Sequence, residues 1–292
     1  MKPKGAMALE KTFILGLGCQ KGGTTWLYKY LSASGNADFG ELKEYHVWNA
    51  LDPENDEARE RYLMVGRVKL RNRILSKIRK ILGIRRKGPV VRYELQRQED
   101  NYFNYFSKLL RADVSVTGDI TPNYSSLSVD TLRKIRSRFL ERGIRTRAVF
   151  LMRDPVERAI SAACMLRRMK LVIGGHDLSA LPLEDAIWAY AQTSHSCFTG
   201  RYDQSVERFD AVFESDEIYY GFYETMFSEE NVQSISDFCG VEPRPDFVNQ
   251  SFNSAPEKAD ISSETRARLR VHFSNVYAYC HQKFPETRQI WN

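Results

Sequence analysis

Cysteine is scarce in this chain of 292 residues, and its distribution excludes two classes of protein. The five cysteines are odd in number and scattered, and no two of them form a CxxC pair. A disulfide framework or a structural zinc site needs closely patterned cysteines. We therefore expect reduced thiols rather than a disulfide-rich domain or a zinc domain. No metal site is predicted, because metal-ligand spacing is also missing from His176, His195, His272 and His281.

Long apolar runs are missing as well. No segment reaches the roughly 20 residues of a membrane-spanning helix. Residues 1–18 carry lysines before a short apolar run, as a signal peptide does, but the run leads directly into a glycine-rich turn. We interpret it as the first core strand and expect a soluble, cytoplasmic protein. Because an apolar content of 42% is ordinary and the length suits one large unit, a single domain over 1–292 is predicted.

A glycine-rich turn joins an apolar stretch to a helical one in residues 13–26, FILGLGCQKGGTTW. The apolar residues 13–17 predict a buried strand, and the spacing of apolar residues from Thr24 to Leu31 predicts a helix. Glycines allow backbone N–H groups to approach an anion at the helix N-terminus. The loop therefore predicts a phosphate cradle, although Thr24 stands where a Walker A motif has its lysine and Lys21 lies within the turn.

A second strand-to-helix corner occurs at residues 147–161, RAVFLMRDPVERAIS. Asp154 and Pro155 suit the N-cap and the first turn of a helix. Arg153, at the end of the apolar strand, is suited to a phosphate group, and Ser161 follows two turns into the helix. Ligands of open α/β sheets lie at the carboxyl ends of strands. The two corners together therefore predict one ligand with two separated anionic groups.

Strands alternate with helices along the chain, which predicts an α/β fold with a P-loop-like central parallel β-sheet and helices on both faces. The aromatic cluster at 102–106 is expected to pack in the core rather than to form a platform for sugars. The expected strands lie near 13–17, 115–119, 146–152 and 217–222. The expected helices lie near 24–34, 129–142, 155–170, 183–193, 201–214, 228–239 and 263–284.

Positive charge is concentrated in one segment. Residues 61–93 contain twelve Lys or Arg residues and no acid, within a chain whose net charge is +6. Apolar residues recur in it at helical spacing, which predicts a basic amphipathic helix ending near Gly83, in an insertion at 61–94. One interpretation is a solvated helix laid on the core by its apolar stripe. The other is that residues 67–87 contact an anionic acceptor, an acidic partner or a membrane surface. In the second case we expect four cations to border an acceptor cleft: Arg71, Arg73, Lys77 and Lys80.

In these motifs the chain resembles the PAPS-dependent sulfotransferases, whose donor is 3'-phosphoadenosine 5'-phosphosulfate (PAPS). The family's 5'-phosphosulfate loop, QKxGTTxL, is similar to residues 20–27, and its 3'-phosphate motif, RDPxxRxxS, is similar to residues 153–161. The KExHFFD and EKTPxY stretches of heparan-sulfate-type members are similar to residues 43–49 and 118–124. The nearest branch is therefore the heparan-sulfate-type or bacterial carbohydrate branch, from which Asn49 and Ile120 depart. The glycine-rich basic loop of steroid and phenol sulfotransferases has no counterpart at 249–262.

The resemblance implies an enzyme that uses PAPS, releases adenosine 3',5'-bisphosphate (PAP) and needs no metal. It implies that Lys21 acts on the bridging oxygen, that Glu44 is the base, and that His46 assists as a third catalytic residue. The donor-binding residues that it implies are Gln20, Lys21, Gly22, Gly23, Thr24, Thr25, Trp26, Arg153 and Ser161. The acceptor-binding residues that it implies are Lys43, Glu44, His46, Thr121 and Tyr124.

The expected acceptor is a hydroxyl group of a glycan or glycolipid, because two of the motifs lean toward carbohydrate-modifying members. A small lipid or natural-product alcohol is the alternative, and no nucleic-acid partner is expected. Two other classes stay open. A nucleotide kinase would need the P-loop lysine that Thr24 replaces and a metal-binding aspartate. An inactive glycan- or membrane-binding module would be expected to lack Lys21 and Glu44.

Overall fold

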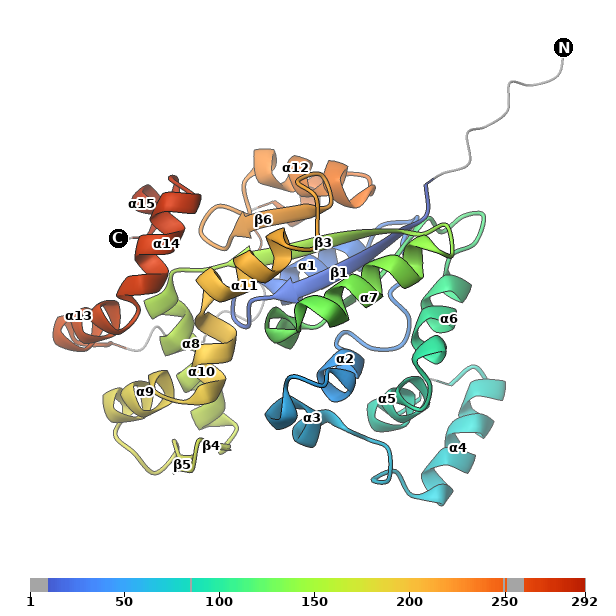
Figure 1. Cartoon of the computed structure of the whole chain (residues 1–292), viewed down its shortest axis with the longest axis horizontal. Helices are drawn as coiled ribbons and strands as arrows, with labels where there is room; N and C mark the ends of the chain where they lie inside the picture. The colour runs from blue at the N-terminus through green and yellow to red at the C-terminus, as the bar shows by residue number, and fades with distance from the viewer. Residues whose placement is uncertain (1–9, 85, 249, 251–259, 292) are drawn as a thin grey trace, which may run out of the picture.

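A four-stranded parallel sheet forms the centre of the computed structural model, which describes residues 10–84, 86–248, 250 and 260–291 (Figure 1). Thr12 pairs with Val116 on one side and with Arg145 on the other, so neighbouring strands begin at the same level. This confirms the predicted α/β fold, with each strand found within one residue of its expected bounds. The strand order is β2 (Val116–Ile120), β1 (Thr12–Gly18), β3 (Arg145–Met152), β6 (Ile218–Phe222).

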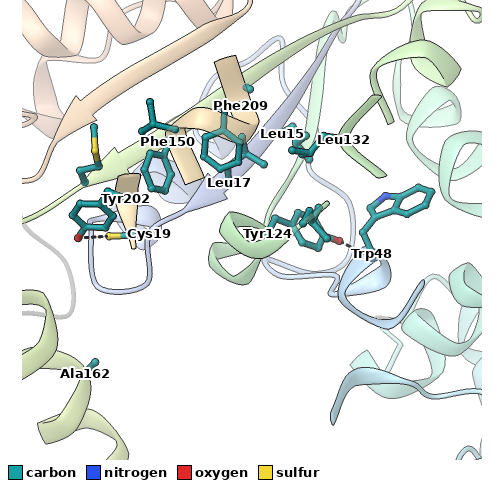
Figure 2. Packing of buried hydrophobic residues seen from close by; sticks show 14 of the residues in the cluster. Leu15, Leu17, Cys19, Trp48, Tyr124, Leu132, Phe150, Ala162, Tyr202 and Phe209 are labelled. Atoms are coloured by element: carbon teal, nitrogen blue, oxygen red, sulfur yellow. Dashed lines mark hydrogen bonds between the residues drawn. The ribbon is translucent and has the colours of Figure 1, made fainter. Parts of the chain in front are cut away.

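Helices cover both faces of the sheet because alternate residues of each strand point to opposite sides. Phe13, Leu15 and Leu17 join one buried cluster, while Ile14 joins the other. Figure 2 shows Leu15, Leu17 and Phe150 of the sheet packed in the first cluster. That cluster includes residues of α6 (Glu99–Leu109), α7 (Val129–Leu140), α8 (Pro155–Arg168) and α11 (Tyr202–Asp210). The second includes residues of α1 (Thr24–Ser32) and α12 (Glu229–Cys239).

The long helix expected at 263–284 is divided at Phe273 into α13 (Ser263–His272) and α14 (Ser274–Lys283). The first half packs on α8 and on α9 (Leu183–Ala191), and the second packs on α11, so the chain turns between two docking surfaces. The helix expected at 201–214 ends earlier, at Asp210. The remaining helices predicted from the pattern are present.

The sequence pattern did not predict several elements, most of which are short. They are α2 (Val47–Leu51), α3 (Asp56–Tyr62), α5 (Gly88–Gln96), α6, α10 (Ser194–Gly200), α15 (Thr287–Ile290), the 3-10 turns η1 (Pro122–Ser126) and η2 (Pro245–Phe247), and a hairpin of β4 (Val172–Ile173) and β5 (His176–Asp177). Most of the segment 249–262, noted above for its missing basic loop, lies outside the described residues. Among the described helices, none is long and apolar enough to cross a membrane.

The basic amphipathic helix is α4 (Leu70–Ile81), followed by Gly83 with a positive φ of 67°. Its apolar stripe does not lie on the core. Ile74 is 52% exposed and Ile81 is 84% exposed, whereas Ser76 is the buried residue of this fully described helix. The interpretation that the stripe holds the helix on the core is therefore wrong. The expected core position of the aromatic cluster is confirmed, because Tyr102, Phe103 and Phe106 are completely buried.

Candidate active site

A large cleft opens at the carboxyl ends of the sheet strands, where the rule for open α/β sheets places a ligand. The loop after β1 contributes Gln20, Lys21 and Thr24 to its wall. The segment after β2 contributes Asn123, and the one after β3 contributes Arg153. The 43–46 stretch lines the same cleft through Lys43, Glu44 and His46, and α8 contributes Ser161. Candidate residues from three of the sequence motifs therefore meet in one place, and the fourth motif, at 118–124, contributes Asn123.

The loop between β1 and α1 can be built only with glycine at key positions. A Cβ on Gly22 would lie 2.5 Å from the Leu151 carbonyl oxygen, and one on Gly23 would lie 2.5 Å from the Met226 sulfur. Gly23 also has a φ of 96°, which side chains with a Cβ rarely adopt. The Gly22 amide donates to the Cys19 carbonyl at 3.1 Å, so Gly22 shapes the loop and its N–H is already used.

The N-terminus of α1 is suited to an anion. Among the described residues no side chain caps it, and its first turn holds no acid. Its first N–H groups lack partners within the helix, and the helix dipole adds positive potential there. Gln20 is next to this turn, and its Oε1 is buried without a hydrogen-bond partner among the described residues. The unpaired N–H groups of this helix N-terminus fit the anionic phosphosulfate end of PAPS, whereas Gln20 Oε1 can only accept a hydrogen bond.

Lys21 lies in a cluster of positive charge. Burial lowers the pKa of Lys21 below its usual value, and the charges of Arg153, Arg168 and Lys43 lower it further. Its backbone has a φ of 72°, in the sparsely populated left-handed region. Such strain is concentrated at functional sites. Gathering like charges costs free energy, and an anionic ligand would remove that cost.

Trp26 does not line the cleft. It is 1% exposed, stacks on Tyr30 with ring centroids 4.7 Å apart, and donates from Nε1 to the Phe247 carbonyl at 3.4 Å. The resemblance implied that Trp26 contacts the donor, but the structure instead gives it a packing role on the buried side of α1. Thr24 and Thr25, the two residues before Trp26, do line the cleft.

The second corner forms as predicted, with Asp154 as the N-cap of α8: its Oδ1 accepts from the Glu157 amide at 2.9 Å. Arg153 lies over the Tyr223 ring, 4.5 Å from the centroid, with its guanidinium 3.9 Å from a Glu157 oxygen. This arrangement keeps the Arg153 side chain at the cleft. Ser161 lies further along the same helix.

Tyr202 links the two corners. Its hydroxyl donates to the Arg153 carbonyl at 2.9 Å and lies 3.3 Å from the Cys19 sulfur, a contact visible in Figure 2. Cys19 is completely buried and packs in the core. Arg158 of the second motif is also completely buried, and it donates to Thr199 and Ser196 of α10 at 3.1 and 3.3 Å. It therefore braces α8 against its neighbours.

Two neighbouring side chains, those of Lys43 and His46, hold the Glu44 carboxylate in place. Lys43 Nζ lies 2.6 Å from its Oε1, and His46 Nε2 lies 3.3 Å from its Oε2. Burial alone would raise the pKa of Glu44, but the hydrogen bond from His46 and the charge and hydrogen bond of Lys43 outweigh it and hold the pKa at about 2. Glu44 is thus ionised at neutral pH and can accept a hydrogen bond, but with so low a pKa it is a weak base in this state.

His46 is placed to orient Glu44. Its ring stacks on Tyr62 with centroids 4.0 Å apart, and its Nδ1 lies 3.0 Å from Asn49 Oδ1. Asn49 donates its own amide to the Asn123 carbonyl at 3.0 Å, which turns its oxygen toward His46. Each ring nitrogen of His46 thus faces an oxygen atom, and these two contacts fix the orientation of the ring. Asn49, a departure from the family pattern, is part of this support.

Thr121 and Tyr124 were expected to contact an acceptor, but both are completely buried. Their hydroxyls donate to Asp119 at 2.6 and 2.8 Å, and Tyr102 donates to it at 3.0 Å. Burial raises the pKa of Asp119, and these hydroxyls act in the opposite direction. Thr121 also accepts from the Tyr45 amide at 3.0 Å, and Tyr124 from the Val47 amide at 3.1 Å. These side chains position the Glu44–His46 segment from below and do not face the cleft.

Sequence reasoning missed several residues of the cleft. Glu224 follows the end of β6 just as Arg153 follows the end of β3. The rule that ligands lie at the carboxyl ends of strands would therefore have been enough to find it. Its carboxylate accepts from the Asp154 amide at 2.9 Å and from Trp291 Nε1 at 3.0 Å, and burial raises its pKa. Arg266 of α13 reaches the cleft with an ion pair to Glu157, and no local sequence signal marks it.

Four expected cations of the basic segment do not border this cleft. Among the described residues that line the cleft, only Arg61 and Tyr62 come from residues 61–93, and none comes from α4. The expectation for Arg71, Arg73, Lys77 and Lys80 is therefore wrong. The segment acts on the site through α5 instead: Arg92 donates to the Glu44 carbonyl at 2.8 Å, and Gln96 donates to the Tyr62 carbonyl at 3.1 Å.

Comparisons with known proteins agree with this geometry. A family model described as a sulfotransferase domain matches residues 10–260. The fold is similar to that of a sulfotransferase from Alicyclobacillus acidocaldarius, with a TM-score of 0.57 and 19% identity over 93% of this chain and 95% of that one. A sulfotransferase domain from the curacin biosynthetic pathway has a TM-score of 0.48 and 14% identity over 90% of this chain and 98% of that one. No curated protein shows significant sequence similarity to the chain.

Proposed function

The chain belongs to the sulfotransferase domain family, a family of PAPS-dependent transferases, and from this premise we propose that it sulfates a hydroxyl of a carbohydrate or glycolipid with Glu44 as the base. The observation that carries the proposal is the meeting of Lys21, Glu44 and Arg153 on the wall of one cleft. Family membership also removes the reason to consider a nucleotide kinase. A small lipid or natural-product alcohol remains the alternative acceptor.

On the donor side, the residues present fit PAPS. Bound PAPS supplies the sulfuryl group and a leaving group, PAP. Thr24, Thr25 and the open N-terminus of α1 hold the 5'-phosphate, and Arg153 with Ser161 holds the 3'-phosphate. Lys21 neutralises the charge that grows on the bridging oxygen in the transition state. Cationic side chains and loop N–H groups thus stabilise the charge that develops in the transition state, and the proposed mechanism uses no metal ion.

On the acceptor side, Glu44 accepts the proton of the attacking hydroxyl, which approaches the sulfur in line with the leaving oxygen. His46 and Lys43 fix the direction of the carboxylate. A sulfonate group in the cleft would compete with Glu44 for Lys43, and losing that ion pair would raise the pKa of Glu44. The base would thereby become stronger when the donor is bound.

The proposed acceptor class is supported by a recess that adjoins the cleft beside the His46–Tyr62 stack. It is lined by amides, hydroxyls and aromatic rings, including those of Asn55, Ser126 and Phe198. Burial lowers the pKa of His195 in its wall to about 4, with help from the charges of Arg61 and Arg158, so its ring is neutral. Hydrogen-bonding groups beside aromatic rings, with the charged Glu57 and Arg61 also in the wall, suit a sugar, which has hydroxyls and an apolar ring face.

A transfer screen tests the proposal. Purified enzyme is incubated with sulfur-labelled PAPS and with separate pools of glycans, glycolipids and small alcohols, and Lys21→Ala serves as the control. The expected result is label in the glycan or glycolipid pool that depends on Lys21. Label confined to small alcohols would contradict the proposed acceptor class while leaving the donor chemistry intact.

A further inference from the structure

Helix α4 lies on the protein by its polar side. Ser76, its buried residue, faces inward. Beside it, the Arg73 guanidinium lies over the Tyr93 ring of α5, 4.9 Å from the centroid. The helix packs on α5 at the edge of the molecule, away from the sheet (Figure 1). This orientation is the reverse of the usual one, in which an amphipathic helix buries its apolar stripe.

The apolar stripe therefore points away from the protein. Successive helix residues are rotated by about 100°, which puts Ile74, Ile78 and Ile81 on the side opposite Ser76. They are 52%, 47% and 84% exposed. The patch extends to other exposed apolar residues of the same segment: Val65, Leu70, Leu75, Leu82 and Ile84. The other exposed large apolar residues of the described chain are fewer and lie in separate segments, so this concentration on one segment marks an interaction surface.

Cations border this patch. Arg71, Lys77 and Lys80 of α4 are exposed, as are Arg67 and Lys69 just before it. Residues 61–93 contain no acid, and Glu41, outside this segment, interacts electrostatically with Lys80. A second copy of the chain would bring two such basic rims together, and their repulsion opposes a dimer through this face. An anionic lipid surface satisfies both features, because headgroup phosphates pair with the cations and the acyl region takes the apolar side chains.

We propose that α4 is a membrane-docking helix that lies in the headgroup region of an anionic lipid bilayer. Twelve residues are far too short to span a bilayer, but an interfacial helix of this length lies flat along the surface. The helix is attached firmly to the enzyme, because α5 beneath it also contacts the Glu44 segment through Arg92. The proposal rests on the surface of α4 and does not depend on the identity of the acceptor.

Vesicle co-sedimentation of the full chain tests the proposal. The vesicles contain phosphatidylcholine alone or phosphatidylcholine with phosphatidylserine, at low and at physiological ionic strength. Binding should rise by about tenfold or more with phosphatidylserine and weaken with salt. The triple variant Ile74→Ser, Ile78→Ser, Ile81→Ser should lose about tenfold or more of that binding, as should Lys77→Glu with Lys80→Glu.

The matched control is Leu140→Ser with Val271→Ser, which removes apolar side chains that are 61% and 75% exposed elsewhere. It should bind vesicles like the wild type, and PAP affinity should be equal in all variants, which reports an intact fold. Absence of binding to phosphatidylserine vesicles, or equal binding by the α4 variants, would overturn the proposal. So would self-association of the wild type that the serine variant abolishes without any vesicle binding, because a second copy would then cover the face.

Discussion

Replacing Glu44 by glutamine removes the proposed base with almost no change in shape. In the native structure one carboxylate oxygen is 2.6 Å from Lys43 Nζ and the other is 3.3 Å from His46 Nε2. The amide keeps one acceptor oxygen but turns an N–H₂ group toward one of these donors. Loss of a positioned general base costs about 10²–10⁴-fold in rate, so we expect kcat of Glu44→Gln to fall within that range.

The same substitution has a calculable effect on stability. Folding lowers the pKa of Glu44 from 4.5 to about 2. The ionised carboxylate therefore contributes stability that is complete above pH 4.5 and is lost as the pH falls toward 2. Because the side chain is 31% exposed, we discount the full linkage value to about 1–3 kcal/mol. The wild type and Glu44→Gln should thus differ in unfolding free energy at neutral pH and converge in acid.

Steady-state transfer, calorimetric PAP binding and thermal unfolding as a function of pH are the assays. PAP affinity should be unchanged, since no donor-binding residue is altered. His46→Ala should lose less activity than Glu44→Gln, because His46 orients the base and does not take the proton. Near-normal turnover in Glu44→Gln together with a large loss in His46→Ala would refute this reasoning and make His46 the base.

Three further predictions concern the donor loop and its support. Lys21→Ala should lower kcat by about 10²–10³-fold and PAP affinity much less; because burial and nearby cations lower the Lys21 pKa, wild-type activity should decline as the pH rises, at a lower pH than an ordinary lysine would give, and Lys21→Arg should lack that decline. Asp119→Asn should cost about 1–3 kcal/mol in urea unfolding and lower kcat more than donor affinity, since one amide oxygen replaces the acceptor of three hydroxyls. Gly23→Ala should weaken PAP binding and destabilise the fold, because its Cβ would meet Met226 at 2.5 Å, whereas Gly35→Ala, with open space around it, should be neutral in both measurements.

Strands β1, β3 and β6 could be predicted closely because each contains a short apolar run that ends in a turn signal, whereas β2 has the mixed sequence VTGDI. The break at Phe273 between α13 and α14 could not be predicted, because the apolar spacing continues through it. Only the two surfaces on which these helices pack reveal it. Short helices such as α2 and α10 lack the length over which a helical period can be recognised. For α4 the period gave the correct apolar face, but a sequence pattern does not say whether that face meets protein or solvent.

The site was predictable where a motif acts through its own loop, as in the Lys21 turn and the Asp154 cap. It was not predictable where a residue acts through partners distant in sequence. Thr121 looked like an acceptor ligand because it lies in a motif, yet its hydroxyl is used by Asp119 and by the Tyr45 amide. Arg266 approaches from a helix more than a hundred residues after Arg153, so only the folded structure brings it to the cleft.

Calorimetric titration of the wild-type protein with PAP and with AMP tests the central claim most directly, that the cleft binds a nucleotide with separate 5'- and 3'-anionic groups. AMP lacks the 3'-phosphate assigned to Arg153 and Ser161, and losing charge-assisted contacts of that kind costs about 1.5–3 kcal/mol. PAP should therefore bind about 10- to 150-fold more tightly than AMP, and Arg153→Ala should reduce that preference. Equal affinities for PAP and AMP would contradict the account.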